Sequence, residues 1–227
     1  MQIFTPKINP PTTESELLTR SNRLQGLSFA QLSMEVKIAI PSNPVHRKGW
    51  VGMALEHVLG TDAKNKSEPD FQELGIELKT LPIAKSGRPA ESTFVTSIPL
   101  LTIHHQNWRT SQCYAKLKRV LWIPIEGDKD TPFEHRRVGN GFLWSPSKQE
   151  EEVLSSDWDY LTWQISSGHL EHLNATVGNY LQVRPKAAHG KSLCFCYDAN
   201  GNKVKTLPRG FYLRSSFTAQ ILINNSR

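Results

Sequence analysis

The spacing of apolar residues along the chain predicts that helices and strands are interspersed. In five segments apolar residues recur at intervals of three and four, which is the helical period. Thr13 with Glu16 has the pattern of a capping box, and Gly60 is the type of residue that ends a helix. The predicted helices run over 13–26, onward from Ser28, and over 50–60, 148–166 and 217–223.

Strict alternation of apolar and polar residues predicts strands elsewhere. The segment 75–81 is predicted to be a half-buried strand, with Ile76 and Leu78 facing the core and Glu77 and Lys79 sharing the opposite face. Pro82 is expected to end this strand. Further strands are predicted over 93–98, 120–125, 141–144, 180–183 and 211–213. The fold class is therefore α/β, with a mixed sheet flanked by helices.

Composition narrows the class of protein. The chain has 227 residues, which suits one domain or two tightly joined lobes, and 38% hydrophobic residues with six Trp argue against an extended disordered protein. No apolar run approaches the ~20 residues that cross a bilayer, and no secretory signal is recognisable. We expect a soluble, cytoplasmic protein. Its three cysteines, an odd number, are expected to be free thiols.

Charge is distributed unevenly along the chain. The formal net charge is +6, and the segment 184–214 alone holds seven Lys and Arg residues against one acid, Asp198. The segment 109–119 adds four more bases, whereas 150–172 contains acids and no Lys or Arg. A basic and an acidic face are therefore expected. A basic face attracts polyanions such as nucleic acid, although solvated surface charge is the ordinary alternative.

One spacing of residues suggests phosphodiester chemistry. Asp70 precedes the strand that carries Glu77 and Lys79, and a turn would bring its carboxylate beside Glu77. Two adjacent carboxylates suit Mg²⁺, which takes its remaining ligands from water and substrate phosphate. A nearby ammonium can hold the attacking water and stabilise charge in the transition state. Glu56, opposite the apolar stripe of its helix, offers a further carboxylate. Alone, however, Glu-x-Lys is typical of a surface ion pair.

The same residues match a known catalytic pattern and lie among more specific strings. Asp70 with Glu77-Leu78-Lys79 matches the PD-(D/E)xK pattern of type II restriction endonuclease-like folds. The more specific strings are KGWVG at 48–52, DF at 70–71 with LGIELKT at 74–80, KLKRVLWIP at 116–124, LQVRPKAA at 181–188 and LPRGFYL at 207–213. Together these strings resemble the MutH family of mismatch-repair endonucleases, and the resemblance spans most of the chain.

The resemblance implies a restriction endonuclease-like domain over 1–227, with two lobes around a DNA cleft. It implies a monomer that requires Mg²⁺ and nicks the unmethylated strand at hemimethylated or unmethylated GATC sites. A MutL-type ATPase would activate it after mismatch recognition by MutS.

The resemblance also assigns residues. The active site would consist of Glu56, Asp70, Glu77, Lys79 and Lys116, with the metal held by Asp70, Glu77 and Glu56. DNA would be contacted by Lys48, Gly49, Phe94, Arg184, Pro185, Lys186 and Tyr212. Each has an ordinary alternative, because aromatic residues in strands often pack in the core and a helix lysine is usually solvated.

Two other functions remain open at this stage. A restriction-type enzyme would cut both strands with the same residues, and a DNA-binding module that does not cleave would keep the fold alone. The loop 101–110, with His104 and His105, and the tail after Ile223 match no pattern.

Overall fold

The computed structural model describes residues 8–61, 63, 67–186 and 192–225, and it comprises two compact units. The first unit is formed by Met1–Ala90 and Arg119–Trp144. The second unit is formed by Glu91–Lys118 and Ser145–Arg227. Each unit therefore combines two separate stretches of chain, and each contains both helices and strands, as the sequence predicts.

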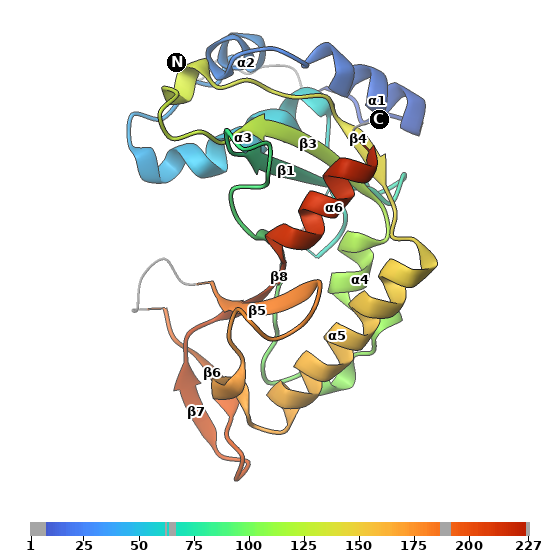
Figure 1. Ribbon diagram of the computed structural model, residues 1–227, viewed down its shortest axis with the longest axis vertical. Helices are drawn as coiled ribbons and strands as arrows, with labels where there is room; N and C mark the ends of the chain where they lie inside the picture. The colour runs from blue at the N-terminus through green and yellow to red at the C-terminus, as the bar shows by residue number, and fades with distance from the viewer. Residues whose placement is uncertain (1–7, 62, 64–66, 187–191, 226–227) are drawn as a thin grey trace. The chain divides into compact units, whose positions relative to one another are not determined.

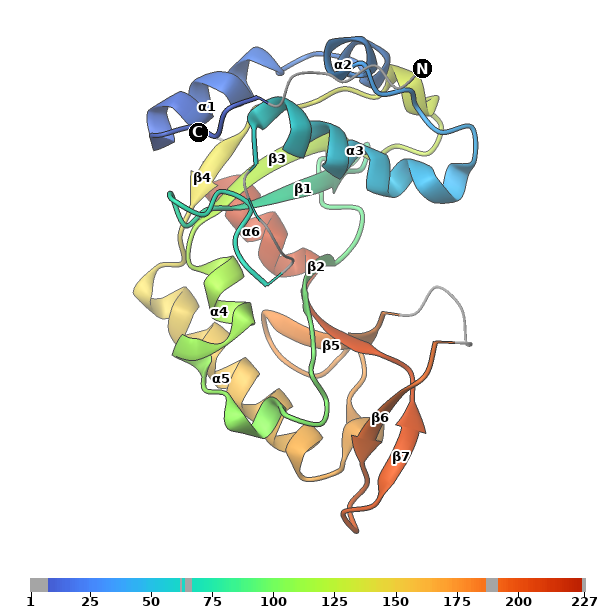
Figure 2. The same ribbon diagram turned by 180° about the vertical axis from the view of Figure 1, so that it is seen from behind.

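Three helices pack on one side of the sheet in the first unit (Figures 1 and 2). They are α1 (Glu14–Arg23), α2 (Phe29–Val36) and α3 (Pro44–Leu59). The predicted caps are present, since the Thr13 side chain accepts from the Glu16 amide and Ser28 forms a capping box with Gln31. The first helix ends earlier than predicted, at Arg23, and the third begins earlier, at a proline whose fixed φ suits a helix start.

The first unit's sheet has the order β1-β3-β4. Strands β1 (Glu77–Ile83) and β3 (Val120–Glu126) are parallel, and β4 (Phe142–Trp144) is antiparallel to β3. A short 3-10 helix, η3 (Phe133–His135), follows β3. The prediction that Pro82 ends β1 is wrong, because the strand continues to Ile83. An edge strand needs N–H groups on only one side and therefore tolerates a proline.

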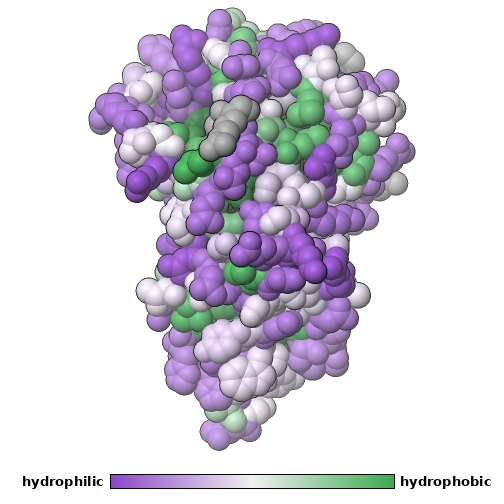
Figure 3. All heavy atoms as spheres, turned by 45° about the vertical axis from the view of Figure 1, so that its right-hand side comes forward, coloured by the Kyte–Doolittle hydropathy of each residue, from purple (hydrophilic) through white to green (hydrophobic). Residues whose placement is uncertain are grey.

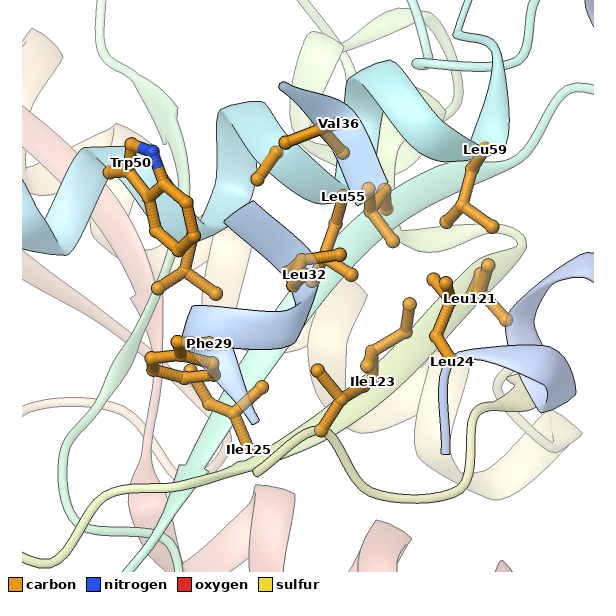
Figure 4. Packing of buried hydrophobic residues seen from close by; sticks show 14 of the residues in the cluster. Leu24, Phe29, Leu32, Val36, Trp50, Leu55, Leu59, Leu121, Ile123 and Ile125 are labelled. Carbon is orange, nitrogen blue, oxygen red and sulfur yellow. The ribbon is translucent and has the colours of Figure 1, made fainter. Parts of the chain in front are cut away.

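Alternate residues of β3 build the core against the helices (Figure 4). Leu121, Ile123 and Ile125 contact side chains from the three helices, including Leu32 and Leu55. Leu78 of β1 belongs to the same cluster. Each such side chain stabilises the fold by about 1.5–3 kcal/mol relative to exposure. Glu77 and Lys79 therefore point to the opposite face of the sheet, as predicted.

The second unit contains a three-stranded antiparallel sheet in the order β2-β8-β5. Its strands are β2 (Thr93–Ser97), β5 (Leu181–Pro185) and β8 (Arg209–Leu213), all anticipated from the sequence. The helices are α4 (Gln112–Leu117), α5 (Lys148–Ser166) and α6 (Ser215–Asn225). Three 3-10 helices, η1 (Ile103–His105), η2 (Trp108–Thr110) and η4 (Leu170–His172), complete it.

A hairpin in the second unit was not predicted. It pairs β6 (Cys194–Tyr197) with β7 (Lys203–Thr206). Asn200-Gly201 is a turn signal that would have indicated it. The Asp198 carboxylate accepts from the amides of Asn200 and Asn202, and Gly201 has a φ of 79°. The two short strands were not predicted because most of their side chains are at least partly exposed, so the sequence shows no clear alternation of apolar and polar residues.

The expected acidic face needs one correction. Asp157 of α5 is 4% exposed, and its carboxylate accepts from the amides of Asn179, Tyr180 and Leu181. It anchors the start of β5 to the helix, so it is a structural residue and not a surface charge.

The surface is mainly polar on the side shown in Figure 3, where hydrophobic residues are scattered among hydrophilic ones. Among the described residues, no helix is both long and apolar enough to pass through a membrane.

Candidate active site and nucleic-acid interface

A tight turn attaches Asp70 to strand β1. Phe71 and Ile76 exchange backbone hydrogen bonds of 2.9 and 3.1 Å, which folds the segment between them back on itself. Gly75, with a φ of 65°, adopts the left-handed conformation that this turn requires. The Asp70 carboxylate consequently accepts a hydrogen bond of 2.8 Å from the Leu78 amide. The structure therefore confirms the turn that the sequence predicts, and it holds Asp70 against the middle of Glu77-Leu78-Lys79.

Glu77 and Lys79 form an ion pair on the face of β1 opposite the helices. Lys79 Nζ lies 2.7 Å from Glu77 Oε1, and the side chains are 11% and 3% exposed. Their partners across the sheet are Val120 and Trp122 of β3, both fully buried. The predicted half-buried strand is therefore more enclosed than expected at Glu77 and Lys79. An ordinary surface pair does not explain two charges placed in a nearly closed site, because burying ions carries a large desolvation cost.

Glu77 is further fixed through its backbone. Its amide donates to the carbonyl of Arg119, 3.0 Å away, and the Arg119 guanidinium binds Glu14 of α1. This hydrogen bonding lowers the pKa of Glu14 below its usual range. The strand end that carries the candidate carboxylate is thus tied to the helical layer.

The donor set fits a divalent cation held by two carboxylates. Asp70 and Glu77 offer oxygen ligands, and Mg²⁺ typically uses one or two carboxylates with waters and substrate phosphate. Within the described residues, no three His, Cys, Asp or Glu side chains gather in a group that could hold a metal ion. Glu56 lies on α3 and is exposed, as the helical pattern predicts, but the structure does not join it to a metal-binding group.

Lys116 belongs to the second unit, on α4. It is 7% exposed, so the ordinary interpretation of a solvated helix lysine is wrong. Its assignment to the active site with Asp70 remains a prediction.

Four of the predicted DNA-binding residues form one cluster on the second unit's sheet. Phe94 of β2 lies opposite Tyr212 of β8, and their rings meet edge to face with centroids 5.3 Å apart. The Arg184 guanidinium lies over the Tyr212 ring at 5.8 Å, and the Lys186 ammonium over the Phe94 ring at 4.7 Å. Cations stacked on ring faces hold their charge at the surface of the sheet.

Two serines, missed from the sequence, orient these cations. Arg184 donates to Ser92 Oγ at 2.6 Å, and Lys186 donates to Ser97 Oγ at 2.5 Å. Gly210 was also missed: a Cβ there would lie 2.8 Å from Phe94 and 3.2 Å from Tyr212. A glycine inside a strand often marks such a close approach, which was the available signal.

The remaining predicted DNA-binding residues are Pro185, Gly49 and Lys48. Pro185 follows Arg184 at the exposed end of β5. Gly49 is an exposed residue of α3 with open space around its Cα, and the side chain of Lys48 lies outside the described part of the structure.

Other candidate ligands do not assemble. His104 and His105 are exposed on η1, with ring centroids 3.9 Å apart and ring planes inclined at 45°. All three cysteines are free thiols, as expected. Burial raises the pKa of Cys196, which makes it a poor nucleophile.

Comparison with known proteins identifies the family of this chain. A family model described as the DNA mismatch repair enzyme MutH matches residues 59–157. The chain is 49% identical over 214 residues to the DNA mismatch repair protein MutH of Vibrio vulnificus (strain YJ016), covering 94% of both chains. It is 45% identical over 217 residues to the protein of the same name from Escherichia coli O9:H4 (strain HS), covering 96% of this chain and 95% of the other. The fold, the paired carboxylates and this similarity over nearly the whole length together show that the chain belongs to the MutH family of DNA mismatch-repair enzymes.

Proposed function

We propose that this protein is a Mg²⁺-dependent DNA endonuclease that nicks the unmethylated strand of hemimethylated or unmethylated GATC sites during methyl-directed mismatch repair. The observation that carries the proposal is the arrangement on β1. Asp70 is bonded to the Leu78 amide, and Glu77 is paired with Lys79 in a nearly closed site. A family relationship alone would not require these charges to be buried together.

Asp70 and Glu77 would hold the metal ion, and Lys79 would act on the water. Bound Mg²⁺ would neutralise phosphate charge and make a coordinated water more acidic. The Lys79 ammonium, already fixed at 2.7 Å from Glu77, would orient the attacking water and stabilise the extra negative charge on the phosphate in the transition state. Glu56 and Lys116 are proposed as a supporting carboxylate and a second ammonium.

The proposed recognition surface would consist of Phe94, Arg184, Lys186 and Tyr212, together with Pro185, Lys48 and Gly49. Arg184 and Lys186 supply donors for phosphates or guanine, and the rings supply a stiff surface against base edges. A methyl group on adenine N6 adds volume in the major groove, so a rigid side chain can reject it. Tyr212 is the proposed sensor because Phe94 supports its ring from one side and Arg184 from its face.

The proposal also covers the oligomeric state, the cellular location and the protein partners. A two-lobed monomer would close around duplex DNA in the cytoplasm, activated by a MutL-type ATPase after MutS has recognised a mismatch.

Cleavage assays test the proposal directly. The substrates are matched duplexes with an unmethylated, hemimethylated or fully methylated GATC site, and supercoiled plasmid, all with Mg²⁺. Nicked circles and cleavage of the first two duplexes are expected. Linear plasmid would indicate a restriction-type enzyme, and intact plasmid a DNA-binding module. Glu73→Ala is the matched control, because Glu73 is an exposed carboxylate in the same turn as Asp70; it should retain wild-type activity.

A further inference from the structure

Gln182 lies at the centre of the recognition cluster without an assigned role. It is the second residue of β5 and pairs directly with Tyr212 of β8, which in turn pairs with Phe94 of β2. Directly opposed residues of antiparallel strands project from the same face, so these three side chains form one row across the sheet. Arg184, two residues further along β5, projects from that face as well.

The neighbours of Gln182 confirm its direction. Leu181 and Val183 are at most 1% exposed, and they pair with Leu213 and Phe211, which belong to the core. Because side chains alternate along a strand, Gln182 faces away from that core.

Gln182 is nearly enclosed, but its carboxamide has no hydrogen-bond partner among the residues that the structure describes. The residue is 5% exposed, yet no hydrogen bond joins its side chain to any other residue that the structure describes. Its amide atoms are also not among the fully sealed polar atoms that lack partners. Asp157, a comparably buried polar residue in the same unit, accepts three backbone N–H bonds. Enclosed polar groups are normally paired, so an unpaired donor and acceptor here indicates a ligand that supplies the complement.

We propose that Gln182 reads the major-groove edge of adenine in the recognition site. This inference rests on the proposed function and adds a specificity residue to it. A carboxamide presents one acceptor and one donor side by side, and adenine presents the complementary N6–H donor and N7 acceptor. Gln182 Oε1 accepts from the N6–H that is not used in base pairing, and Nε2 donates to N7.

The same geometry links Gln182 to methylation. In paired adenine one N6 hydrogen is used by thymine, so a methyl group must replace the hydrogen that faces the major groove. Methylation therefore removes the donor that Oε1 requires and leaves an enclosed acceptor unpaired. Tyr212, directly opposite, would exclude the methyl group by its volume, whereas Gln182 would reject it by the lost hydrogen bond.

The test combines a protein change with a base change. Gln182→Met keeps the length of the side chain and removes both polar groups, and 7-deazaadenine removes N7 from the site. Binding of the full-length protein to GATC and scrambled duplexes is measured by fluorescence anisotropy with Ca²⁺, and nicking in a single turnover with Mg²⁺. Gln220→Met, an exposed glutamine of α6, is the matched control.

We expect 7-deazaadenine to weaken wild-type binding to GATC about 10- to 100-fold, the usual discrimination of a bidentate contact. Gln182→Met should bind the normal GATC duplex more weakly than wild type by a similar factor, and 7-deazaadenine should weaken its binding little further. Its thermal melt and its affinity for scrambled duplex should stay unchanged. Gln182→Glu provides a second variant that keeps the shape and the acceptor but cannot donate to N7. Its binding should likewise be weakened little by 7-deazaadenine.

Two results would overturn the proposal while leaving the proposed function intact. One is a wild-type protein that prefers GATC but binds 7-deazaadenine equally well. The other is a folded Gln182→Met or Gln182→Glu variant that keeps the full 7-deazaadenine penalty. A wild-type protein with no preference for GATC would instead overturn the proposed function, and this inference with it.

Discussion

The Asp70 carboxylate accepts a hydrogen bond of 2.8 Å from the Leu78 amide, so a residue outside the sheet is fixed against the middle of β1. Leu78 lies between Glu77 and Lys79, which pair with each other on the opposite side of the strand from the Leu78 side chain. One backbone amide therefore sets the position of the first candidate ligand relative to the second.

This hydrogen bond allows the structural and chemical roles of Asp70 to be separated. Asp70→Ala removes both the charge and the acceptor, and should lose nicking activity and about 1–3 kcal/mol of unfolding free energy. Asp70→Asn keeps an acceptor for the Leu78 amide, so it should be closer to wild type in stability but equally inactive. Glu77→Ala should also be inactive.

Chemical denaturation and plasmid nicking measure the two roles. DNA affinity without metal should be unchanged or improved in Asp70→Ala, because a carboxylate near phosphates repels them. Nicking by Asp70→Asn at a rate near wild type would show that the Asp70 charge is not needed to hold a metal.

Lys79 should affect both stability and rate. Lys79→Met removes a partner of the buried Glu77 carboxylate, so we expect a loss of about 2–3 kcal/mol without metal, below the usual cost for a fully buried pair because Lys79 keeps 11% exposure. A divalent cation near Glu77 should restore part of this loss, raising the melting temperature of the variant more than that of wild type.

The single-turnover nicking rate of Lys79→Met should fall by about 10²–10³, the usual cost of removing a group that stabilises transition-state charge. DNA affinity in Ca²⁺ serves as the control. A defect confined to affinity would assign Lys79 to DNA binding and not to the chemical step.

Substitutions at Tyr212 and Arg184 should have different effects, the first on methyl sensing and the second on binding of the site. Tyr212→Ser should narrow the rate differences among unmethylated, hemimethylated and fully methylated GATC duplexes, because the stiff ring that excludes the methyl group is removed. Arg184→Ala should slow nicking of every cleavable duplex, because its donors act on the site whatever its methylation. Rates on all three duplexes are required for each variant.

A thermal melt must accompany the Tyr212→Ser rates, since the ring is half-buried and packs against Phe94. Unchanged methyl discrimination in a folded Tyr212→Ser variant would exclude the sensing role.

The ion pair between Glu14 and Arg119 predicts a pH dependence of stability. The hydrogen bond from Arg119 lowers the pKa of Glu14 in the folded protein, from an ordinary value near 4.5. A lowered carboxyl pKa stabilises the fold above the unfolded-state pKa, and the contribution disappears as pH falls through the folded-state pKa. Glu14→Gln should therefore be less stable than wild type at pH 7, by at most about 1 kcal/mol because both side chains are partly exposed.

The difference between Glu14→Gln and wild type should close as the pH falls below about 4. Urea unfolding at a series of pH values measures it, with Glu73→Gln as an exposed control. A difference that stays constant with pH would mean that the pair contributes no charge-dependent stability.

The local sequence determined the elements and much of the chemistry. Capping residues and apolar periodicity fix α1, α2 and α5 because these signals act within a few residues. The alternation around Glu77 fixes which side chains share a face. The spacing of Asp70, Glu77 and Lys79 suggested phosphodiester chemistry, and the longer strings around it indicated the family.

Tertiary structure decided which of these groups are enclosed and what each one contacts. Alternation in a strand cannot distinguish an open face from a covered one, so the burial of Glu77 and Lys79 was not predictable. Asp157 looked like a surface acid because its backbone donors are more than 20 residues away in sequence. Gln182 gave no signal at all, since its significance depends on Tyr212 of a strand that pairs with its own through the sheet. Contacts between distant segments depend on packing, which no local pattern encodes.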